Sequence, residues 1–358
     1  MKSTTSASPP SNPGGDDVGV GSVAPSRDWL WAHLLVLCAV GFAATFVGPV
    51  SWTPRSVWDS CVSGDGAVFS AWIEIRARRV LFAGTVGALL SVAGSVFQSI
   101  LRNPLAEPYI LGVSGGASLA TVLALVLGVD LIRDSVIFPI QAWIAFGGSL
   151  LSVMLLFAIA RWGRLRDPAN LILCGVVLNS IFLAGIVLFL VTASETLVTR
   201  TLPWLMGDLS GVHDVVPRMA LLRNGIAVLG GVLLFWGVSR RLDLMSLSDE
   251  EAADLGVPVA RFRWVTLIGA SLLTGIAVAG VGPVGFVGLI VPHIIKLIHG
   301  PVHRRVIPAT AVTGATFLIA SDAIARAIGA LPVGAITALA GGPFFFLLLV
   351  RQRREVGS

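Results

Sequence analysis

Charged residues are scarce in this sequence. Asp, Glu, Lys and Arg make up only 13% of its 358 residues, whereas 55% are hydrophobic. A water-soluble domain usually carries roughly a quarter of charged residues, and one core could not bury so much apolar surface. The composition excludes a soluble globular protein. It predicts an all-α polytopic membrane protein that has lipid as its solvent.

Cysteine is also rare, with three residues in the whole chain. Cys38 and Cys174 lie inside apolar runs, and Cys61 stands alone in a polar stretch. This pattern excludes a disulfide framework and does not have the spacing of a metal site. His293, a lone histidine after Pro292, is interpreted as a structural or interface residue. We expect no metal site and no directly bound cofactor.

The middles of the apolar runs contain almost no ionisable residues. A transporter driven by a proton or sodium gradient usually keeps such residues at membrane depth. The best candidate pair, Asp322 and Arg326, is four residues apart, a spacing at which the two neutralise each other on one helix face. The Gly-rich phosphate-binding pattern that ends in Gly-Lys-Ser/Thr is missing as well. The chain is predicted to have no catalytic residues, and its energy is expected to come from a partner.

Long apolar runs are what the sequence does contain. A helix needs about 20 mainly apolar residues to cross a bilayer. About ten runs approach that length: 29–50, 79–100, 106–128, 136–160, 169–192, 215–238, 264–282, 284–299, 306–328 and 332–350. Basic residues concentrate in alternate connections and in the C-terminal tail, which predicts that both termini are cytoplasmic. The Ser-, Pro-, Gly- and Asp-rich segment 1–27 is predicted to be a disordered cytoplasmic tail.

Two of the runs carry small residues at every fourth position. One stripe consists of Ala83, Gly87, Ser91 and Ser95, and the other of Ser271, Gly275 and Ala279. Such stripes let another helix approach closely. We interpret both as helix packing rather than as the lining of a pore.

One connection, between the sixth and seventh runs, is long and polar. Ser248 can cap a short helix whose first turn is acidic, and Gly256 can end it. Such a helix could present Leu247, Ala252 and Leu255 to a groove on another protein. Taken alone, these residues favour that docking helix and a solvated connector equally.

Several motifs in one fixed order identify a resemblance. They are Arg102–Ala117 (RNPLAEPYILGVSGGA), Pro203–Gly207 (PWLMG), Gly285–His293 (GFVGLIVPH) and Gly341–Phe345 (GGPFF). Together they resemble the iron-siderophore and vitamin B12 permease family of ABC importers, along residues 29 to 354. The motif positions expected to be structural are Asn103, Pro104, Leu105, Ala106, Gly112, Gly115, Pro292 and His293.

The resemblance implies a permease domain at 28–354 with a coupling loop at about 240–263. It implies a ten-helix subunit in the bacterial inner membrane, paired with a second copy or a close paralogue. Two cytoplasmic ATPase subunits would bind ATP and Mg, and a substrate-binding protein would dock outside. The cargo would be an iron-siderophore, haem or cobalamin-type chelate, and the sequence leaves these three open.

Site residues follow from the same resemblance. The ATPase-coupling set is Leu247, Ser248, Asp249, Glu250, Glu251, Ala252, Leu255 and Gly256. Arg76, Arg79 and Arg326 would dock the binding protein. The inner gate would include Asp167, Pro168, Ala169 and Asn170.

Two other classes of protein are the alternatives to this interpretation. A secondary transporter driven by an ion gradient needs buried ionisable groups, and a membrane-embedded enzyme needs clustered His, Asp or Glu near a helix end. The sequence displays neither pattern. An ATPase gene beside this one would distinguish the importer from both alternatives.

Overall fold

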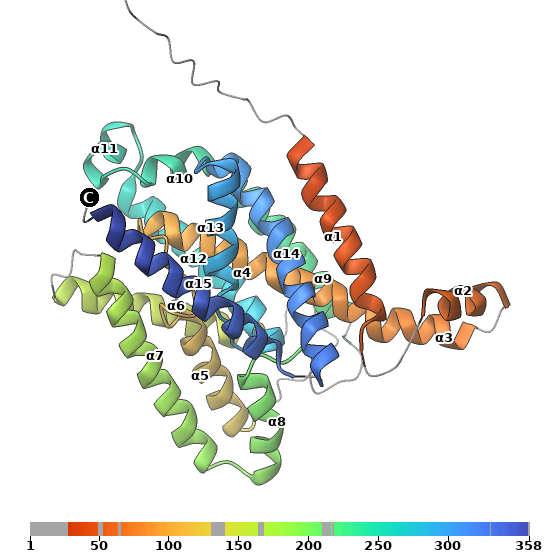
Figure 1. The fold of residues 1–358 in the computed structure, drawn as a ribbon. Coiled ribbons are helices and arrows are strands. Elements are labelled where there is room, and N and C mark those ends of the chain that lie inside the picture. Colours follow the sequence, from red (N-terminus) through yellow and green to blue (C-terminus); the bar gives the residue numbers. More distant parts are fainter. Residues whose placement is uncertain are drawn as a thin grey trace, which may run out of the picture.

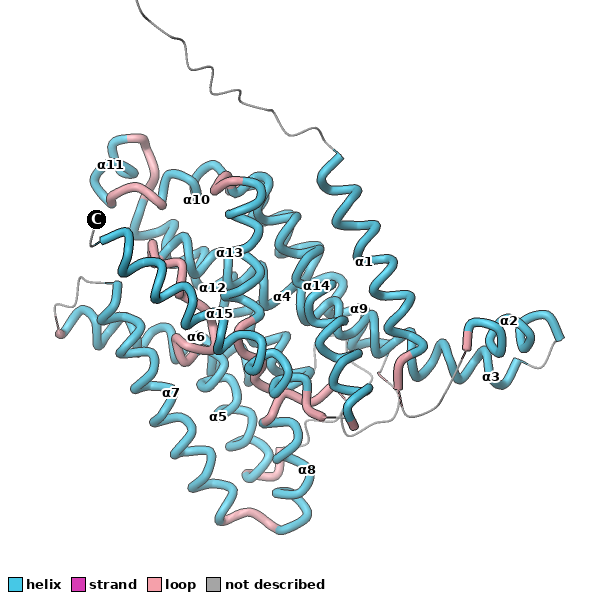
Figure 2. The backbone as a smooth tube through the Cα atoms, in the orientation of Figure 1, coloured by secondary structure: helices cyan, strands magenta, loops and turns pink. Residues whose placement is uncertain are grey.

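The structure, a computed structural model, describes residues 28–48, 53–63, 66–129, 140–163, 168–209, 216, 218–329 and 331–356. Within these ranges the regular elements are all helices, as the composition predicts (Figure 2). The predicted tail, residues 1–27, lies outside the described part of the chain.

Sixteen helical elements follow one another in the described part of the chain. They are α1 (Asp28–Phe46), α2 (Pro54–Ser63), α3 (Gly66–Ala71), the π-helical turn η1 (Trp72–Ala77), α4 (Arg78–Ile100), α5 (Val113–Val126), α6 (Ile140–Trp162), α7 (Pro168–Val191), α8 (Glu195–Leu205), α9 (Arg218–Gly237), α10 (Ser239–Met245), α11 (Asp249–Asp254), α12 (Val259–Val281), α13 (Val287–His299), α14 (His303–Ile328) and α15 (Val333–Val356).

Each of the ten predicted apolar runs overlaps one of these helices. In the described part of the chain, seven helical stretches are long and apolar enough to cross a membrane, and the apolar helices within 113–126, 287–299 and 333–348 are shorter. The chain is an integral membrane protein. Figure 1 places α10 and α11 at one end of the bundle, close to the C-terminal end of α15, and α8 at the other end.

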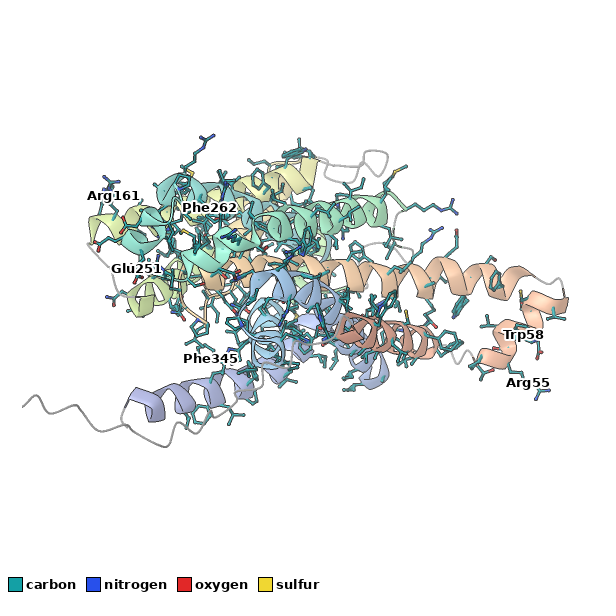
Figure 3. The ribbon with its side chains drawn as sticks, turned by 90° about the horizontal axis from the view of Figure 1, so that it is seen from above. Arg55, Trp58, Arg161, Glu251, Phe262 and Phe345 are labelled. Carbon is teal, nitrogen blue, oxygen red and sulfur yellow. The ribbon has the colours of Figure 1, made fainter. Side chains whose placement is uncertain are left out.

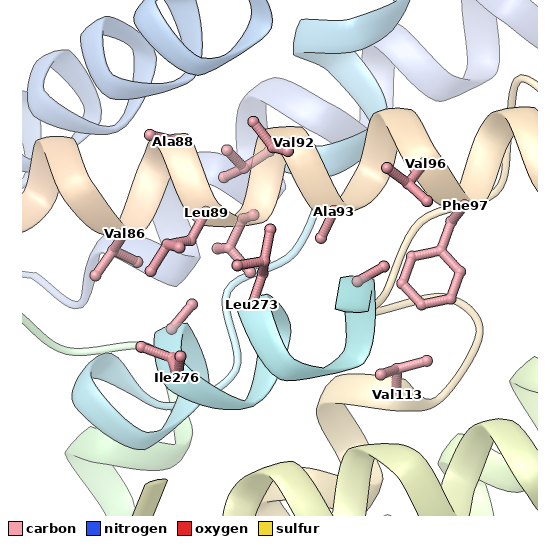
Figure 4. Close-up of a cluster of buried hydrophobic side chains, with 14 of the residues drawn as sticks. Val86, Ala88, Leu89, Val92, Ala93, Val96, Phe97, Val113, Leu273 and Ile276 are labelled. Carbon is pink, nitrogen blue, oxygen red and sulfur yellow. The ribbon is translucent and has the colours of Figure 1, made fainter. Parts of the chain in front are cut away.

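Helix α4 forms the centre of the bundle. Leu89 and Phe97 of this helix are each 1% exposed and belong to the same buried cluster as Leu273 and Ile276 of α12 (Figure 4). Its small-residue stripe faces α14, where a Cβ on Gly87 would lie 2.2 Å from the carbonyl oxygen of Gly314. The predicted packing role of this stripe is confirmed.

The second stripe packs helix α12 against α6. A Cβ on Gly275 would lie 2.7 Å from the Cα atom of Phe146. The Ser149 hydroxyl donates a 2.9 Å hydrogen bond to the carbonyl oxygen of Ser271. A contact this short is possible because Gly275 carries no side chain where the backbone of α6 passes.

The connections before α5 and α13 are irregular. They meet inside the bundle, and each shortens the helix that follows it. The predicted span 106–128 becomes helical only at Val113, because residues 101–112 form turns. The backbone N–H of Phe286, just before α13, donates a 2.8 Å hydrogen bond to Glu107, which is 1% exposed. The Glu107 side chain thus caps the start of α13 by accepting one of its free backbone N–H groups.

Apart from the predicted helix in the polar connection, the sequence did not predict the short helices outside the main spans. Helices α2 and α3 project from the bundle, and in Figure 3 the labelled Arg55 and Trp58 lie at the far end of that projection. Helix α8 is a third case, with Ser194 as its N-cap. At 6 to 11 residues, these helices are too short to leave a clear periodic signal.

Candidate coupling and docking sites

The predicted short helix in the polar connection is α11. The Ser248 hydroxyl accepts a 3.1 Å hydrogen bond from the N–H of Glu251, and the Glu251 carboxylate accepts a 2.9 Å bond from the N–H of Ser248. This is a complete capping box. The hydrogen bonds from Ser248 lower the pKa of Glu251. Gly256, at φ +84°, follows the helix in a left-handed conformation, so both predicted ends are confirmed.

The surface of α11 is partly apolar. Leu247 is 42% exposed and Leu255 is 59% exposed, on either side of an acidic first turn. Ala252, by contrast, is fully buried, so the expectation that it is presented to a partner is wrong. It packs into the core of the bundle and holds the helix in place.

Two arginines tether α11 to the membrane body. Asp249 accepts a hydrogen bond from Arg102 and a 2.7 Å bond from Arg263 at the start of α12. Arg102 also donates a 2.8 Å bond to the carbonyl oxygen of Met245 from a left-handed backbone at φ 49°. Partial burial would raise the pKa of Asp249, but the two guanidinium groups outweigh it and lower that pKa. Arg102 thereby joins the motif segment 101–112 to the coupling loop.

A second tether holds α10, and sequence analysis missed it. Asp243 accepts hydrogen bonds from the backbone N–H of His303 at 2.8 Å and from its Nδ1 at 2.6 Å. The other ring nitrogen of His303 contacts the Ser99 hydroxyl near the end of α4. Ser99 and His303 are 3% and 2% exposed, and Ser99 also donates to the Ser95 carbonyl. The Ser-His-Asp order resembles a hydrolase triad, but its burial excludes substrate and makes it a structural link.

The three predicted docking arginines come together at the opposite end of α4 and α14. Asp322 lies 2.8 Å from Arg79 and 2.9 Å from Arg326, which confirms the predicted Asp322–Arg326 pair. Arg76 donates a 2.9 Å hydrogen bond to the carbonyl oxygen of Val47. The side chain of Arg326 is 2% exposed and that of Arg79 is 17% exposed. One carboxylate thus faces three guanidinium groups. Contact between these arginines and a binding protein stays a prediction.

The motif residues have backbone roles. The Asn103 side chain accepts a 2.9 Å hydrogen bond from the N–H of Leu105, which closes a turn. Gly112, at φ 79°, precedes α5 and accepts a 2.9 Å bond from Ser152 through its carbonyl oxygen. The His293 ring lies edge-on to Phe344 at 5.8 Å. These contacts agree with a structural role for the motif positions.

Of the predicted gate residues, Asp167 lies outside the described part of the chain. Pro168 is the first residue of α7, and Asn170 is half-buried in its first turn. The gating role stays a prediction. Among the described residues, no group of three or more His, Cys, Asp and Glu side chains could hold a metal ion.

Comparison with known proteins places this architecture in a family. The model of the FecCD transport family matches residues 34–351, which is most of the chain. The chain belongs to the FecCD transport family. The haemin transport system permease protein HmuU of Yersinia pestis is 35% identical over 325 residues, with 90% of this chain and 94% of that protein covered.

Two further comparisons agree with the assignment to the FecCD transport family. The cobalamin import system permease protein BtuC of Halobacterium salinarum is 40% identical, with 79% of this chain and 73% of that protein covered. A solved structure, described as an inward-facing conformation of a proposed metal-chelate type ABC transporter, is 29% identical with a TM-score of 0.71. It covers 90% of this chain and 98% of that one. FecCD proteins are permease subunits of ABC transporters and are not themselves enzymes.

Proposed function

We propose that this chain forms, with a second copy of itself, the membrane pathway of an ATP-driven importer for metal-chelate cargo. Haemin and cobalamin permeases are among its relatives, so iron-siderophore, haem and cobalamin are the cargo classes to test. Two ATP-binding subunits and an external substrate-binding protein complete the assembly. The proposed location is the bacterial cytoplasmic membrane.

The observation that carries the proposal is the geometry of α11. A rigidly capped helix with exposed Leu247 and Leu255 fits a groove on another protein. Its tethers run through Asp249 to Arg102 and Arg263, so a push on α11 reaches α12 and the segment after α4. Movement of an ATPase that grips α11 would shift the balance between inward- and outward-open states of the pathway.

The external partner would dock near the other end of α4. Arg76, Arg79 and Arg326 bring three positive charges together around the carboxylate of Asp322 at this end. Acidic residues on a binding protein would complement that charge and set the rate and register of docking.

Reconstitution in liposomes tests the proposal. The chain is combined with the ATPase encoded beside it and with a binding protein loaded with siderophore, haem or cobalamin. We expect uptake that requires ATP and that is lost in Leu255→Asp, because a charge enters the apolar contact with the ATPase. Leu127→Asp, which changes an exposed leucine at the end of α5, is the matched control.

The same assay can reject the proposal. Uptake that ignores ATP but follows an imposed proton or sodium gradient would establish a secondary transporter instead. Equal uptake by wild type and Leu255→Asp, with the ATPase still bound to both, would remove α11 from the coupling path.

A further inference from the structure

A groove at the junction of α9 and α12 has no role in the function proposed above. It encloses about 270 Å³. Its floor is made by two buried rings, Phe235 at 1% and Phe262 at 6% exposure. Its sides include Leu234 and Val265, which are 50% and 53% exposed. Figure 3 labels Phe262 in the same part of the molecule as Glu251 of α11.

Two arginines line the same groove. Arg241 at the start of α10 and Arg261 at the start of α12 are both exposed. Within the described part of the chain, no carboxylate lines the groove and neither arginine belongs to an ion pair. The groove is therefore apolar along its floor and cationic at the helix termini.

The surroundings place the groove at a membrane interface. Leu233 and Ile268, one residue or one turn away on the same two helices, are exposed apolar side chains that suit lipid contact. Trp236 and Trp264 are each 42% exposed, and tryptophan is enriched at the level of the lipid headgroups. The groove thus extends from the headgroup region toward the acyl chains.

We propose that this groove binds an anionic phospholipid. Its phosphate would lie between the Arg241 and Arg261 guanidinium groups, and the beginning of one acyl chain would cover the Phe235 and Phe262 rings. Basic pockets between transmembrane helices commonly recognise anionic headgroups. The volume suits the glycerol-phosphate end of a lipid, while the rest of the chain follows the exposed sides of α9 and α12. This proposal does not depend on ATP-driven import.

Native mass spectrometry of the full chain in neutral detergent tests the site. The chain is mixed with equal amounts of phosphatidylglycerol and phosphatidylcholine of matched acyl chains. Each basic residue near a membrane surface favours an anionic lipid by about fivefold, so wild type should prefer phosphatidylglycerol by about 25-fold. Arg241→Gln and Arg261→Gln should each lose about fivefold, and the double variant should have no preference.

Two further variants and a competitor make the test specific. Arg240→Gln changes the exposed arginine next to Arg241 that does not line the groove, and it should behave as wild type. Val265→Trp fills the groove with both arginines intact and should lower phosphatidylglycerol binding. The proposal is overturned if Arg240→Gln loses as much as Arg241→Gln, or if Val265→Trp has no effect. Displacement of the lipid by inorganic phosphate at equal concentration would also overturn it, since the site would then take any anion.

Discussion

The smallest unit that positions α11 is the carboxylate of Asp249. It is 48% exposed and is shared by Arg102 and Arg263. Because exposed ion pairs contribute up to about 1 kcal/mol each, we expect Asp249→Asn to loosen α11 without unfolding the chain. Hydrogen exchange at the amides of 250–255 should rise severalfold. Glu250→Gln, on the adjacent residue, for which the described structure records no ion pair, is the control and should exchange like wild type.

The pH dependence of that tether follows from the direction of the pKa shift. The pKa of Asp249 is lowered in the folded state, so its contribution is complete above the unfolded value of about 3.9 and is lost as the pH falls through the folded pKa. The difference in unfolding temperature between wild type and Asp249→Asn should be constant from about pH 7 to pH 5 and should vanish at lower pH. A difference that grows on acidification would contradict this assignment.

At the scale of helices, Asp243 joins three of them by capping α14 and orienting His303 against Ser99 of α4. Asp243→Ala would leave the buried N–H of His303 without its acceptor, at a cost of about 1–3 kcal/mol. Asp243→Asn keeps an acceptor oxygen and should restore most of the loss. Thermal unfolding in detergent measures both, with Asp254→Ala on exposed Asp254 as control. Equal unfolding temperatures for the Ala and Asn variants would rule out the capping role.

The crossing of α4 and α14 depends on the absence of side chains. A Cβ at position 87 would approach the Gly314 carbonyl oxygen to 2.2 Å and the Leu318 Cβ to 2.8 Å, so Gly87→Ala must push the helices apart. We expect a loss of about 1–3 kcal/mol, seen as a lower unfolding temperature. Gly230→Ala on α9, where nothing lies within 4 Å, should be neutral or stabilising by up to about 1 kcal/mol. A similar loss in both variants would show that helix crossing is not the cause.

The length of the apolar runs predicts these helices because lipid imposes a minimum apolar length. It does not predict where a span breaks, since the break at 101–112 is fixed by tertiary contacts such as Glu107 with the Phe286 N–H, 179 residues away. The candidate sites also differ in whether they depend on local or on tertiary contacts. The Ser248–Glu251 capping box is local and readable, whereas the Arg79–Asp322 pair joins residues 243 apart and appears only when α4 meets α14.

For the whole molecule, α4 and α14 form one unit that is linked at both ends. Ser99 meets His303 at the end that holds α10, and Arg79 meets Asp322 at the other. Between these links, glycine contacts leave the helices little room to slide. A displacement of the predicted coupling loop at one end would therefore move Arg79 and Asp322 at the other. This arrangement gives a physical route by which events on the two sides of the membrane could be coupled.

That route requires α2 and α11 to lie on opposite sides of the membrane, with α11 in the cytoplasm. The native Cys61 on α2 is exposed and reports one side. In a Cys38→Ser, Cys174→Ser background, a membrane-impermeant maleimide should label Cys61 in intact cells. With Cys61→Ser and Glu250→Cys added, labelling should require permeabilised cells, because α11 would face the cytoplasm. Labelling of the Glu250→Cys variant in intact cells would place α11 outside, where no ATP-binding subunit could reach it, and the proposed coupling would fail.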